Sequence, residues 1–399
     1  MSVSFLPGEI YKKRHESIRK FLEKEGYEGF VVLTPDNFFY TTGFMLDVAP
    51  WERPVAAVIP RNAEPFLVMN ELSTHHIRMA KERGTLAVED IYIWREHPSS
   101  TNRFYTRLQW TELLAAELSK RGIDRGVLAC DANFASIKPV TNALPKISFV
   151  VEGKLLEMMR TVKCEEELVY FREGGKLSDF GQEVFKSLVR PGMLVADVDS
   201  ETVRQMRVKG AEMFPDSALS VYCSSLSGPA SASPHGTGAG SDSTFEAGHV
   251  IVNIIIVRLN GYVTENERTW ILGGASDIQA RAHNAAEGAC IAAARQMAAG
   301  NLVSSIDAAA QAVIEAAGFG DHIRHRTGHG LGIAGHEFPD DVAFNHRALM
   351  ANEVWSAEPG IYVYGVGGFR HDDTVIVGPV KPELVTHWPK NLEDQTIKA

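Results

Sequence analysis

The hydrophobic pattern of the chain changes near residue 165, and this change constrains the fold more than any other feature. Before it, short apolar segments alternate with helical patterns such as 107–121. The apolar segments are 29–33, 56–59, 65–68 and 126–130. Alternation of this kind favours an α/β domain with a partly parallel sheet.

After residue 165, two blocks of long helices are each followed by apolar strands. The predicted helices are 165–190, 194–210, 277–299 and 301–318, and the predicted strands are 249–257, 262–272, 354–364 and 373–378. This order predicts an α+β domain with helices packed on one face of a curved antiparallel sheet. We therefore predict two domains, 1–157 and 158–399, which suits a chain of 399 residues because single cores rarely grow that large.

Composition and charge argue against several classes of binding partner. The formal net charge of -10 disfavours nucleic acid, because binding phosphates requires a basic face. No apolar run approaches the roughly 20 residues that cross a bilayer. The cysteines lie too far apart for a zinc site or a disulfide framework, at positions 130, 164, 223 and 290. We expect a cytoplasmic protein that acts on a small molecule.

Two acids in the predicted strand 262–272 share one face. Because side chains alternate along a strand, Glu265 and Glu267 point to the same side. Two carboxylates on one face repel each other unless a positive charge lies between them. The apolar neighbours Val263 and Trp270 argue against an exposed edge strand. The pattern therefore predicts a metal ion or a cationic substrate at this face.

Histidines gather in two glycine-rich segments. His235 lies in a Gly/Ser-rich loop, 224–241. The unperturbed pKa of a histidine, about 6.5, suits a general base, although a solvated loop histidine is the more common interpretation of this pattern taken alone. The other segment, 325–337, contains His329 and His336 among glycines that allow backbone to approach a ligand closely. Histidines at this density indicate metal ligation or substrate contact.

Acids also stand at the edges of two later strands. Glu358 lies between Trp355 and Ile361, a setting that fits a surface loop poorly. Asp372 and Asp373 follow a Gly-Gly-Phe-Arg-His sequence, and Asp373 suits either a surface loop or a site. Buried acids are costly unless they are paired or used, so both segments predict function.

Four motifs in this order resemble the pita-bread superfamily of methionine aminopeptidase, prolidase and creatinase. They are GY-x-T-E-N-E-R-T, TGHGLG-x-x-x-HE, EPGIY and GG-F-R-H-D-D-T. The segment 37–44 also resembles the creatinase/prolidase N-terminal domain. The resemblance implies a pita-bread catalytic domain preceded by a smaller α/β domain.

In the metallopeptidase members of this superfamily, five positions hold the metal ligands Asp, Asp, His, Glu and Glu. In this chain these positions fall on Ile254, Glu265, His329, Glu358 and Asp372. Only the third and fourth keep the residue type of the family. Because divalent ions favour charged oxygen ligands, the missing first acid argues against the usual dinuclear site. We therefore expect an enzyme without a cofactor.

Creatinase, which works without metal, has a similar pattern. It too lacks the first acid, places a Glu before the Arg-Thr pair (here Glu267), and keeps a loop histidine (His235) and the Glu358 position. The resemblance implies a hydrolase that cleaves a C–N bond in a small carboxylate-bearing substrate. A guanidino or amide acid qualifies, as does a cyclic amidine of the kind opened by ectoine hydrolase. Creatine itself is not implied, because creatinase has no acid at position 265 and has His at position 372.

The resemblance also suggests roles. Glu267 and Glu358 hold a cationic group and His235 transfers the proton, or a glutamate attacks directly. The expected substrate-binding residues are Trp51, Arg53, Glu265, His329, His336 and Arg370. By resemblance the enzyme is a homodimer in which Arg53 reaches the site of the partner subunit.

Two alternatives remain open at this point. A prolidase-like Xaa-Pro dipeptidase or aminopeptidase would hold one Mn, Zn or Fe ion through Glu265, His329, Glu358 and Asp372. A pita-bread protein without catalysis would instead serve as a binding module.

Overall fold

The computed structural model describes residues 3–46, 48–97, 106–235, 240–338 and 342–399. Contacts divide it into two compact units, Phe5–Arg160 and a second that comprises Thr161–Ala399 with the stretch ending at Ser4. The predicted boundary between residues 157 and 158 falls inside helix α7 (Gly153–Thr161). The units are described separately below.

The first unit contains a six-stranded mixed sheet in the order β4-β3-β2-β1-β5-β6. Strand β1 is parallel to β5 and antiparallel to β2, which confirms the predicted partly parallel sheet. The strands are β1 (Gly29–Val32), β2 (Ala56–Pro60), β3 (Phe66–Asn70), β4 (Asp90–Trp94), β5 (Gly126–Cys130) and β6 (Ile147–Val151). The helices are α1 (Gly8–Glu25), α2 (Pro35–Thr42), α3 (Thr74–Arg83), α5 (Thr106–Lys120), α6 (Lys138–Ala143) and α7.

Strand β1 shows why this sheet is covered on both faces. All four of its residues are buried, with Phe30 and Val32 in one hydrophobic cluster and Val31 in another. Successive side chains of a strand point to opposite faces, so an unbroken apolar run needs packing partners on each side. The short run that predicted a buried strand therefore describes the centre of a three-layered unit.

The second unit is built on a seven-stranded sheet whose main path is β10-β13-β9-β8-β7, with β14 and β15 at its side and a separate β11-β12 pair. The strands are β7 (Leu219–Ser227), β8 (Val250–Leu259), β9 (Tyr262–Leu272), β10 (Val354–Ala357), β11 (Gly360–Val363), β12 (Gly367–Arg370), β13 (Asp372–Ile376), β14 (Glu383–Leu384) and β15 (Thr396–Ile397). The helices are α8 (Glu165–Leu188), α9 (Val195–Met213), α10 (Asp277–Gln296) and α11 (Ser304–Ala316).

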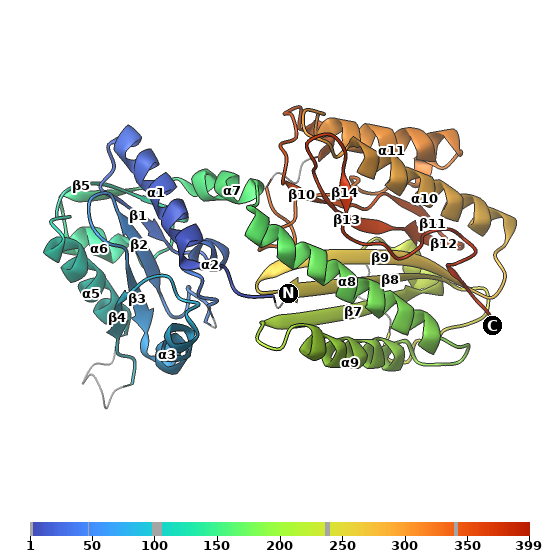
Figure 1. Cartoon of the computed structure of the whole chain (residues 1–399), viewed down its shortest axis with the longest axis horizontal. Helices are drawn as coiled ribbons and strands as arrows, with labels where there is room; N and C mark the ends of the chain where they lie inside the picture. Colours follow the sequence, from blue (N-terminus) through green and yellow to red (C-terminus); the bar gives the residue numbers. More distant parts are fainter. Residues whose placement is uncertain (1–2, 47, 98–105, 236–239, 339–341) are drawn as a thin grey trace. The chain divides into compact units, whose positions relative to one another are not determined.

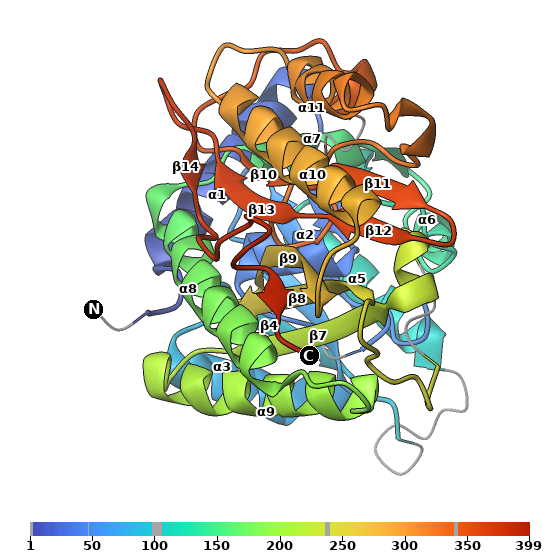
Figure 2. The same ribbon diagram turned by 90° about the vertical axis from the view of Figure 1, so that its right-hand side faces the viewer.

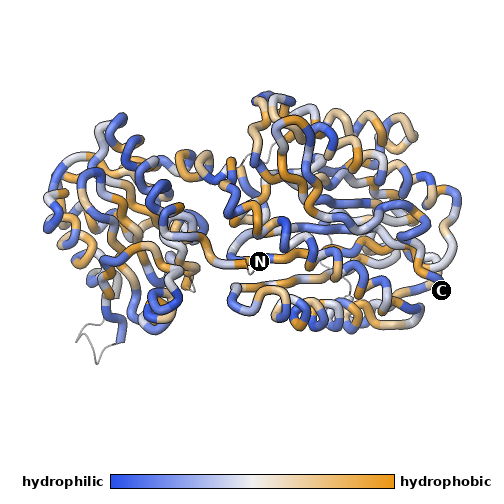
Figure 3. Tube along the Cα trace, viewed as in Figure 1, coloured by the Kyte–Doolittle hydropathy of each residue, from blue (hydrophilic) through white to orange (hydrophobic). Residues whose placement is uncertain are grey.

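Helices α8 and α9 lie along β7, β8 and β9, whereas α10 and α11 lie along the part of the unit that contains β10 to β13 (Figures 1 and 2). Both pairs alternate hydrophobic and hydrophilic stretches, as a helix with one buried face does (Figure 3). This arrangement confirms the predicted α+β class. None of the helices formed by the described residues combines the length and apolarity needed to cross a membrane.

The side chains of β9 alternate between a face that packs on α8 and the opposite face of the sheet. Thr264 and Asn266 face α8, where a Cβ on Gly174 would lie 2.7 Å from the Thr264 hydroxyl oxygen. Asn266 donates a hydrogen bond to the Ser178 hydroxyl on the same helix, at 3.0 Å. The intervening residues of β9 therefore point to the opposite face of the sheet, away from α8.

Two strand predictions differ from the structure. The single predicted strand 354–364 is two strands, β10 and β11, because Pro359 between them has no N–H to continue the ladder. The predicted loop 224–241 begins inside β7, whose last four residues, three serines and Leu226, pair with β8. Serine-rich composition indicated a loop there, but pairing with the apolar strand β8 keeps the segment extended.

Candidate active site

Strands β7, β8 and β9 form one wall of a cavity of about 470 Å³ in the second unit. Its polar lining comprises Tyr222, Ser224, His235, Glu265, Glu267, His329, His336, Glu358 and Arg370. Its apolar lining comprises Leu226, Pro234, Ile254 and Ile256. The cavity therefore brings segments far apart in the sequence to one place.

Aliphatic side chains accompany the two acids of β9. In the antiparallel register of β8 and β9, Ile254 is the Cα partner of Glu267 and Ile256 is the partner of Glu265. Directly paired residues project from the same face of a sheet. One side of the cavity is consequently apolar, although it adjoins a dense group of charges.

Three carboxylates, two of which line the cavity, form a compact group. Oxygen atoms of Glu267, Glu358 and Asp372 lie within 4.8 Å of one another. Asp372 is fully buried, and neither of its carboxylate oxygens accepts a hydrogen bond from any described residue. A buried carboxylate without a donor is costly, so Asp372 in particular lacks a positive partner among the described residues.

Arg370 neutralises only part of this charge. Its Nη2 donates to Glu267 Oε1 at 3.0 Å, and its Nε contacts the other oxygen of the same carboxylate. The guanidinium also donates to the Pro234 carbonyl at 3.0 Å and to the Tyr362 hydroxyl at 3.3 Å. These contacts fix Arg370 beside Glu267, and Asp372 receives no hydrogen bond from it.

His329 contacts two other acids of the cavity, Glu358 and Glu265. Its Nε2 lies 3.3 Å from Glu358 Oε1 and 3.6 Å from Glu265 Oε2. Its Nδ1 lies 3.2 Å from the Gly330 carbonyl, which requires a proton on Nδ1. The ring stacks on His336 with 3.6 Å between centroids, so its position is fixed from both sides.

The pKa values reflect an excess of acids over cations. Burial raises the pKa of Asp372 well above its ordinary value, and the charges of Glu358 and Glu265 raise it further. Burial also raises the pKa of Glu265 to about 8, against the opposing effect of His329. Burial acts in the same direction on Glu358, but the hydrogen bond and charge of His329, together with the charges of Arg370 and His325, outweigh it and lower that pKa to about 2. The group therefore holds protons that a cation can displace.

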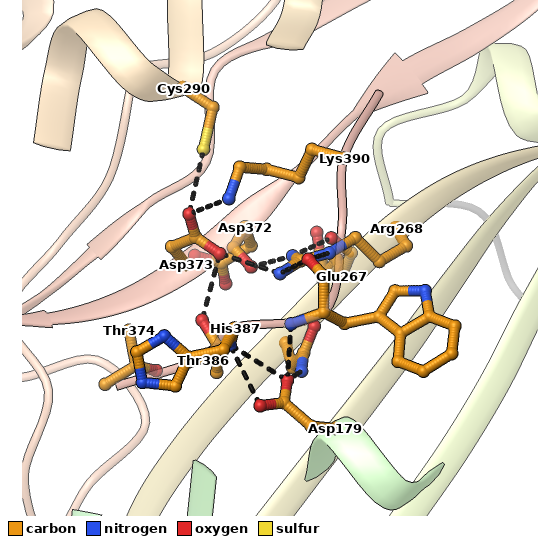
Figure 4. A network of polar contacts seen from close by, with 12 residues as sticks. Asp179, Glu267, Arg268, Cys290, Asp372, Asp373, Thr374, Thr386, His387 and Lys390 are labelled. Atoms are coloured by element: carbon orange, nitrogen blue, oxygen red, sulfur yellow. Dashed lines mark hydrogen bonds and ion pairs between the residues drawn. The ribbon is translucent and has the colours of Figure 1, made fainter. Parts of the chain in front are cut away.

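A second set of buried charges connects the acid-bearing strands to the C-terminal segment (Figure 4). Arg268 and Lys390 both pair with Asp373, at 2.8 Å and 2.6 Å. Asp373 is 1% exposed, which excludes the surface-loop interpretation. Burial would raise its pKa, but Arg268 and Lys390 hold it below its ordinary value. Asp373 is thus a structural anion next to the site residue Asp372.

The predicted site residues fall in two places. Seven of them line the same cavity: His235, Glu265, Glu267, His329, His336, Glu358 and Arg370. Trp51 and Arg53 belong to the other unit, where Trp51 is 71% exposed and Arg53 pairs with Glu52 and Glu96. Their roles stay predictions.

Sequence reasoning missed the contribution of β7 and the support behind Arg370. Tyr222, Ser224 and Leu226 alternate into the cavity, a period-2 signal obscured by the serines around them. The Tyr362 hydroxyl lies 2.8 Å from His325 Nε2, and both side chains stood within motifs without an assigned role.

Comparison with known proteins identifies relatives of both units. Metallopeptidase family M24 matches residues 170–379, and the creatinase/prolidase N-terminal domain matches residues 14–162. Protein YkvY of Bacillus subtilis (strain 168), named as a predicted dipeptidase, is 29% identical over 95% of this chain and 99% of its own. The Xaa-Pro dipeptidase of Lactobacillus helveticus is 25% identical over 95% of this chain and 98% of its own.

A solved structure agrees with these relatives. Dipeptidase PepE from Mycobacterium ulcerans has a TM-score of 0.81 and 26% sequence identity, and the match covers 99% of this chain and all of that one. The two-domain pita-bread architecture is therefore shown.

The expectation of an enzyme without a cofactor is wrong. The matched family is a metallopeptidase family, and a carboxylate group suited to a divalent ion is present. The error arose because the missing acid at Ile254 was judged alone, whereas the surplus of acids around Asp372 is a property of the assembled site. Buried carboxylates with one nearby His are ligands that Mn, Fe and Zn ions accept.

The metal set expected from the sequence, Glu265, His329, Glu358 and Asp372, stays a prediction. Among the described residues, the compact group contains Glu267 with Glu358 and Asp372, whereas Glu265 lies next to His329. With a metallopeptidase match over more than half of its length and the accompanying N-terminal domain, the chain belongs to metallopeptidase family M24, within the creatinase/prolidase superfamily.

Proposed function

We propose that this hydrolase is a metal-dependent dipeptidase or aminopeptidase, with Xaa-Pro dipeptides as its first candidate substrates. The observation that carries the proposal is the group of Glu267, Glu358 and Asp372 at a cavity of about 470 Å³, in which Asp372 has no hydrogen-bond donor among the described residues. The Xaa-Pro dipeptidase named among its relatives supports the substrate class. The creatinase-like reaction on an amidine or guanidino acid has less support.

The ion would be held by Glu267, Glu358 and Asp372, with His329 at 3.3 Å from Glu358. The chemistry that a divalent ion would supply there is Lewis-acid polarisation of a substrate carbonyl and a more acidic bound water. Because Asp372 is fully buried and has no hydrogen-bond donor among the described residues, cation binding would satisfy a group that the fold leaves unpaired.

The chain supplies positioning and proton transfer around this centre. Arg370 fixes the carboxylate of Glu267, and His329 lies between Glu358 and Glu265. Glu265, whose pKa burial raises to about 8, holds a proton near neutral pH and can deliver it to a leaving nitrogen. His235 and His336 line the cavity with exposed rings that can bind a substrate carboxylate.

The apolar wall suits a substrate with an apolar ring. Leu226, Ile254 and Ile256 project from neighbouring strands into the cavity. A prolyl ring carries no donor and packs on such a surface without leaving a polar group unpaired. The charged half of the cavity then receives the peptide bond and the substrate termini.

The proposed enzyme is a cytoplasmic homodimer in which Arg53 binds a substrate carboxylate in the partner's site. Its side chain is 27% exposed and already pairs with Glu52 and Glu96, so it can exchange these for a substrate. Arg53→Ala should raise KM with little change in kcat, while Arg61→Ala, equally exposed and paired with Glu28, should change neither. Equal kinetics for the two variants, or a monomer in sedimentation, would contradict this arrangement.

Activity after metal removal tests the function. Chelated and dialysed protein should not cleave Xaa-Pro dipeptides, and Mn, Zn or Fe should restore cleavage. Glu358→Gln should abolish it, whereas Glu393→Gln, at an exposed glutamate, should not. Chelator-resistant hydrolysis of ectoine or a guanidino acid would establish the creatinase-like reaction instead. No turnover on any of these substrates with any ion would favour the binding module.

A further inference from the structure

We infer that Glu267 replaces, from the neighbouring strand, the acid that is missing at Ile254, and that the site holds one divalent ion per chain. This inference rests on the metal dependence of the proposed function. It assigns the ligand role to Glu267 in place of Glu265, which stands at the superfamily's second acidic position.

Strand register carries the first step of the argument. Ile254 and Glu267 are Cα partners in the ladder of β8 and β9, and Glu267 and Asp372 are Cα partners in the ladder of β9 and β13. The three residues therefore form one row across three adjacent strands. Side chains directly paired in antiparallel strands have Cβ atoms about 4.5–5.5 Å apart, so an acid on either strand reaches the same volume.

Geometry supports the exchange. Glu267 brings a carboxylate oxygen within 4.8 Å of ligand atoms of both Glu358 and Asp372, while Ile254 lines the same cavity with an aliphatic side chain. Arg370 binds the carboxylate of Glu267 at 3.0 Å through Nη2, which limits its rotation. A carboxylate fixed on one side and facing two further acids on the other is oriented for a cation.

Charge supports it as well. Glu267, Glu358 and Asp372 carry three acidic groups in a buried space, which Arg370 contacts through Glu267 and His329 contacts through Glu358. Asp372 has no donor among the described residues. One divalent ion would bring the group close to neutrality, whereas two would leave it positive.

A second ion finds few ligands. The remaining acid, Glu265, lies 3.6 Å from His329, and its cross-strand partner is Ile256. Apart from that histidine, the neighbouring positions on β8 offer the aliphatic side chains of Ile254 and Ile256. Hard divalent ions favour several oxygen ligands, which this part of the cavity does not supply.

The experiment measures bound metal and needs no substrate. Chelated protein is loaded with Mn²⁺, freed of excess ion on a desalting column and analysed by mass spectrometry for metal per chain, with affinity from calorimetry. The wild type should retain about one ion per chain, and Glu267→Gln should weaken binding at least about tenfold. The matched control is Glu265→Gln, which changes the same residue type two positions away on the same face and should cost only a few-fold.

A reciprocal variant guards against simple misfolding. Glu267→Thr with Ile254→Asp moves the carboxylate back across the ladder and should recover the binding that Glu267→Thr alone loses. Circular dichroism and melting curves confirm that each variant is folded; Gln at position 267 can still accept from Arg370.

The outcomes separate this inference from the proposed function. Normal binding by Glu267→Gln together with loss in Glu265→Gln would overturn it while leaving a metallopeptidase. Two ions per chain, or none in the wild type, would also overturn it. One ion that depends on Glu267, in a protein that cleaves no dipeptide, would uphold it and reject the proposed function.

Discussion

Arg268→Met tests whether the acid-bearing strands are held in place by one buried guanidinium. Arg268 is fully buried and donates to the carbonyls of Glu267 and Asp372, both at 2.8 Å, and to Asp373 Oδ1 at 2.8 Å. It also donates twice to the Trp388 carbonyl, at 2.9 Å and 3.1 Å. One side chain thus joins β9, β13 and the C-terminal segment.

The expected cost follows from these contacts. Removing one partner of a buried ion pair costs about 3–5 kcal/mol. Lys390 still pairs with Asp373 at 2.6 Å, so the lower end of that range applies, about 3 kcal/mol. Carbonyls that lose a buried donor add about 1 kcal/mol or more. For a unit of this size, a total of about 4 kcal/mol lowers the melting temperature by roughly 10 °C.

Calorimetry measures the shift, and hydrogen exchange assigns it. Peptides from β9 and β13 should lose protection in Arg268→Met, because their backbone carbonyls lose a common donor. Arg204→Met is the control, since Arg204 is exposed and pairs with Glu201 on the same helix. The chain has two units, so the transition that moves must be the one that these peptides report. A shift no larger than that of the control would refute the reasoning.

Two further predictions concern residues around the site. Burial lowers the pKa of His283 from 6.5 to about 4. The buried neutral ring therefore contributes its full stability above pH 6.5, and roughly 3 kcal/mol of the free energy of unfolding is lost as the pH falls to about 4. Urea unfolding at several pH values should show this loss, and His283→Asn should reduce it. An equal slope in that variant would count against the assignment. Gly328→Ala should lower both the melting temperature and the Mn²⁺ affinity, because the new Cβ would lie 2.1 Å from the Ser356 carbonyl oxygen. The matched control is Gly335→Ala, whose Cβ would lie 3.5 Å from Glu265 Oε1, an ordinary contact distance. Equal melting temperatures and Mn²⁺ affinities for the two variants would contradict the prediction.

Periodicity along single strands was sufficient for part of the site. Alternation predicts that Glu265 and Glu267 share a face, and the contacts of Thr264 and Asn266 with α8 confirm it. The break at Pro359 was equally visible, but the apolar residues on both sides of it favoured one continuous strand. Local pattern alone cannot weigh a missing N–H against a long apolar run.

Contacts between segments far apart in the sequence could not be predicted from such local patterns. Whether Asp373 lies in a loop or in the core depends on Arg268 and Lys390, and Lys390 stands outside every motif. The burial of Asp372 without a donor depends likewise on strands and helices from the whole second unit. These are properties of the assembled sheet, and no window of sequence contains them.

Strand register explains why a comparison of ligand positions along the chain misjudged the metal site. Position 254 holds an isoleucine where the metallopeptidase pattern has an acid, and position 267, thirteen residues further along the chain, holds a glutamate. In the antiparallel ladder the two are direct partners, and Asp372 continues the same row. A carboxylate can therefore change strands while the space it reaches stays almost the same. Each row of paired residues across the sheet therefore still contains acids. The Ile254→Asp and Glu267→Thr exchange tests whether ion binding requires the carboxylate on a particular strand or only in the space that both strands reach.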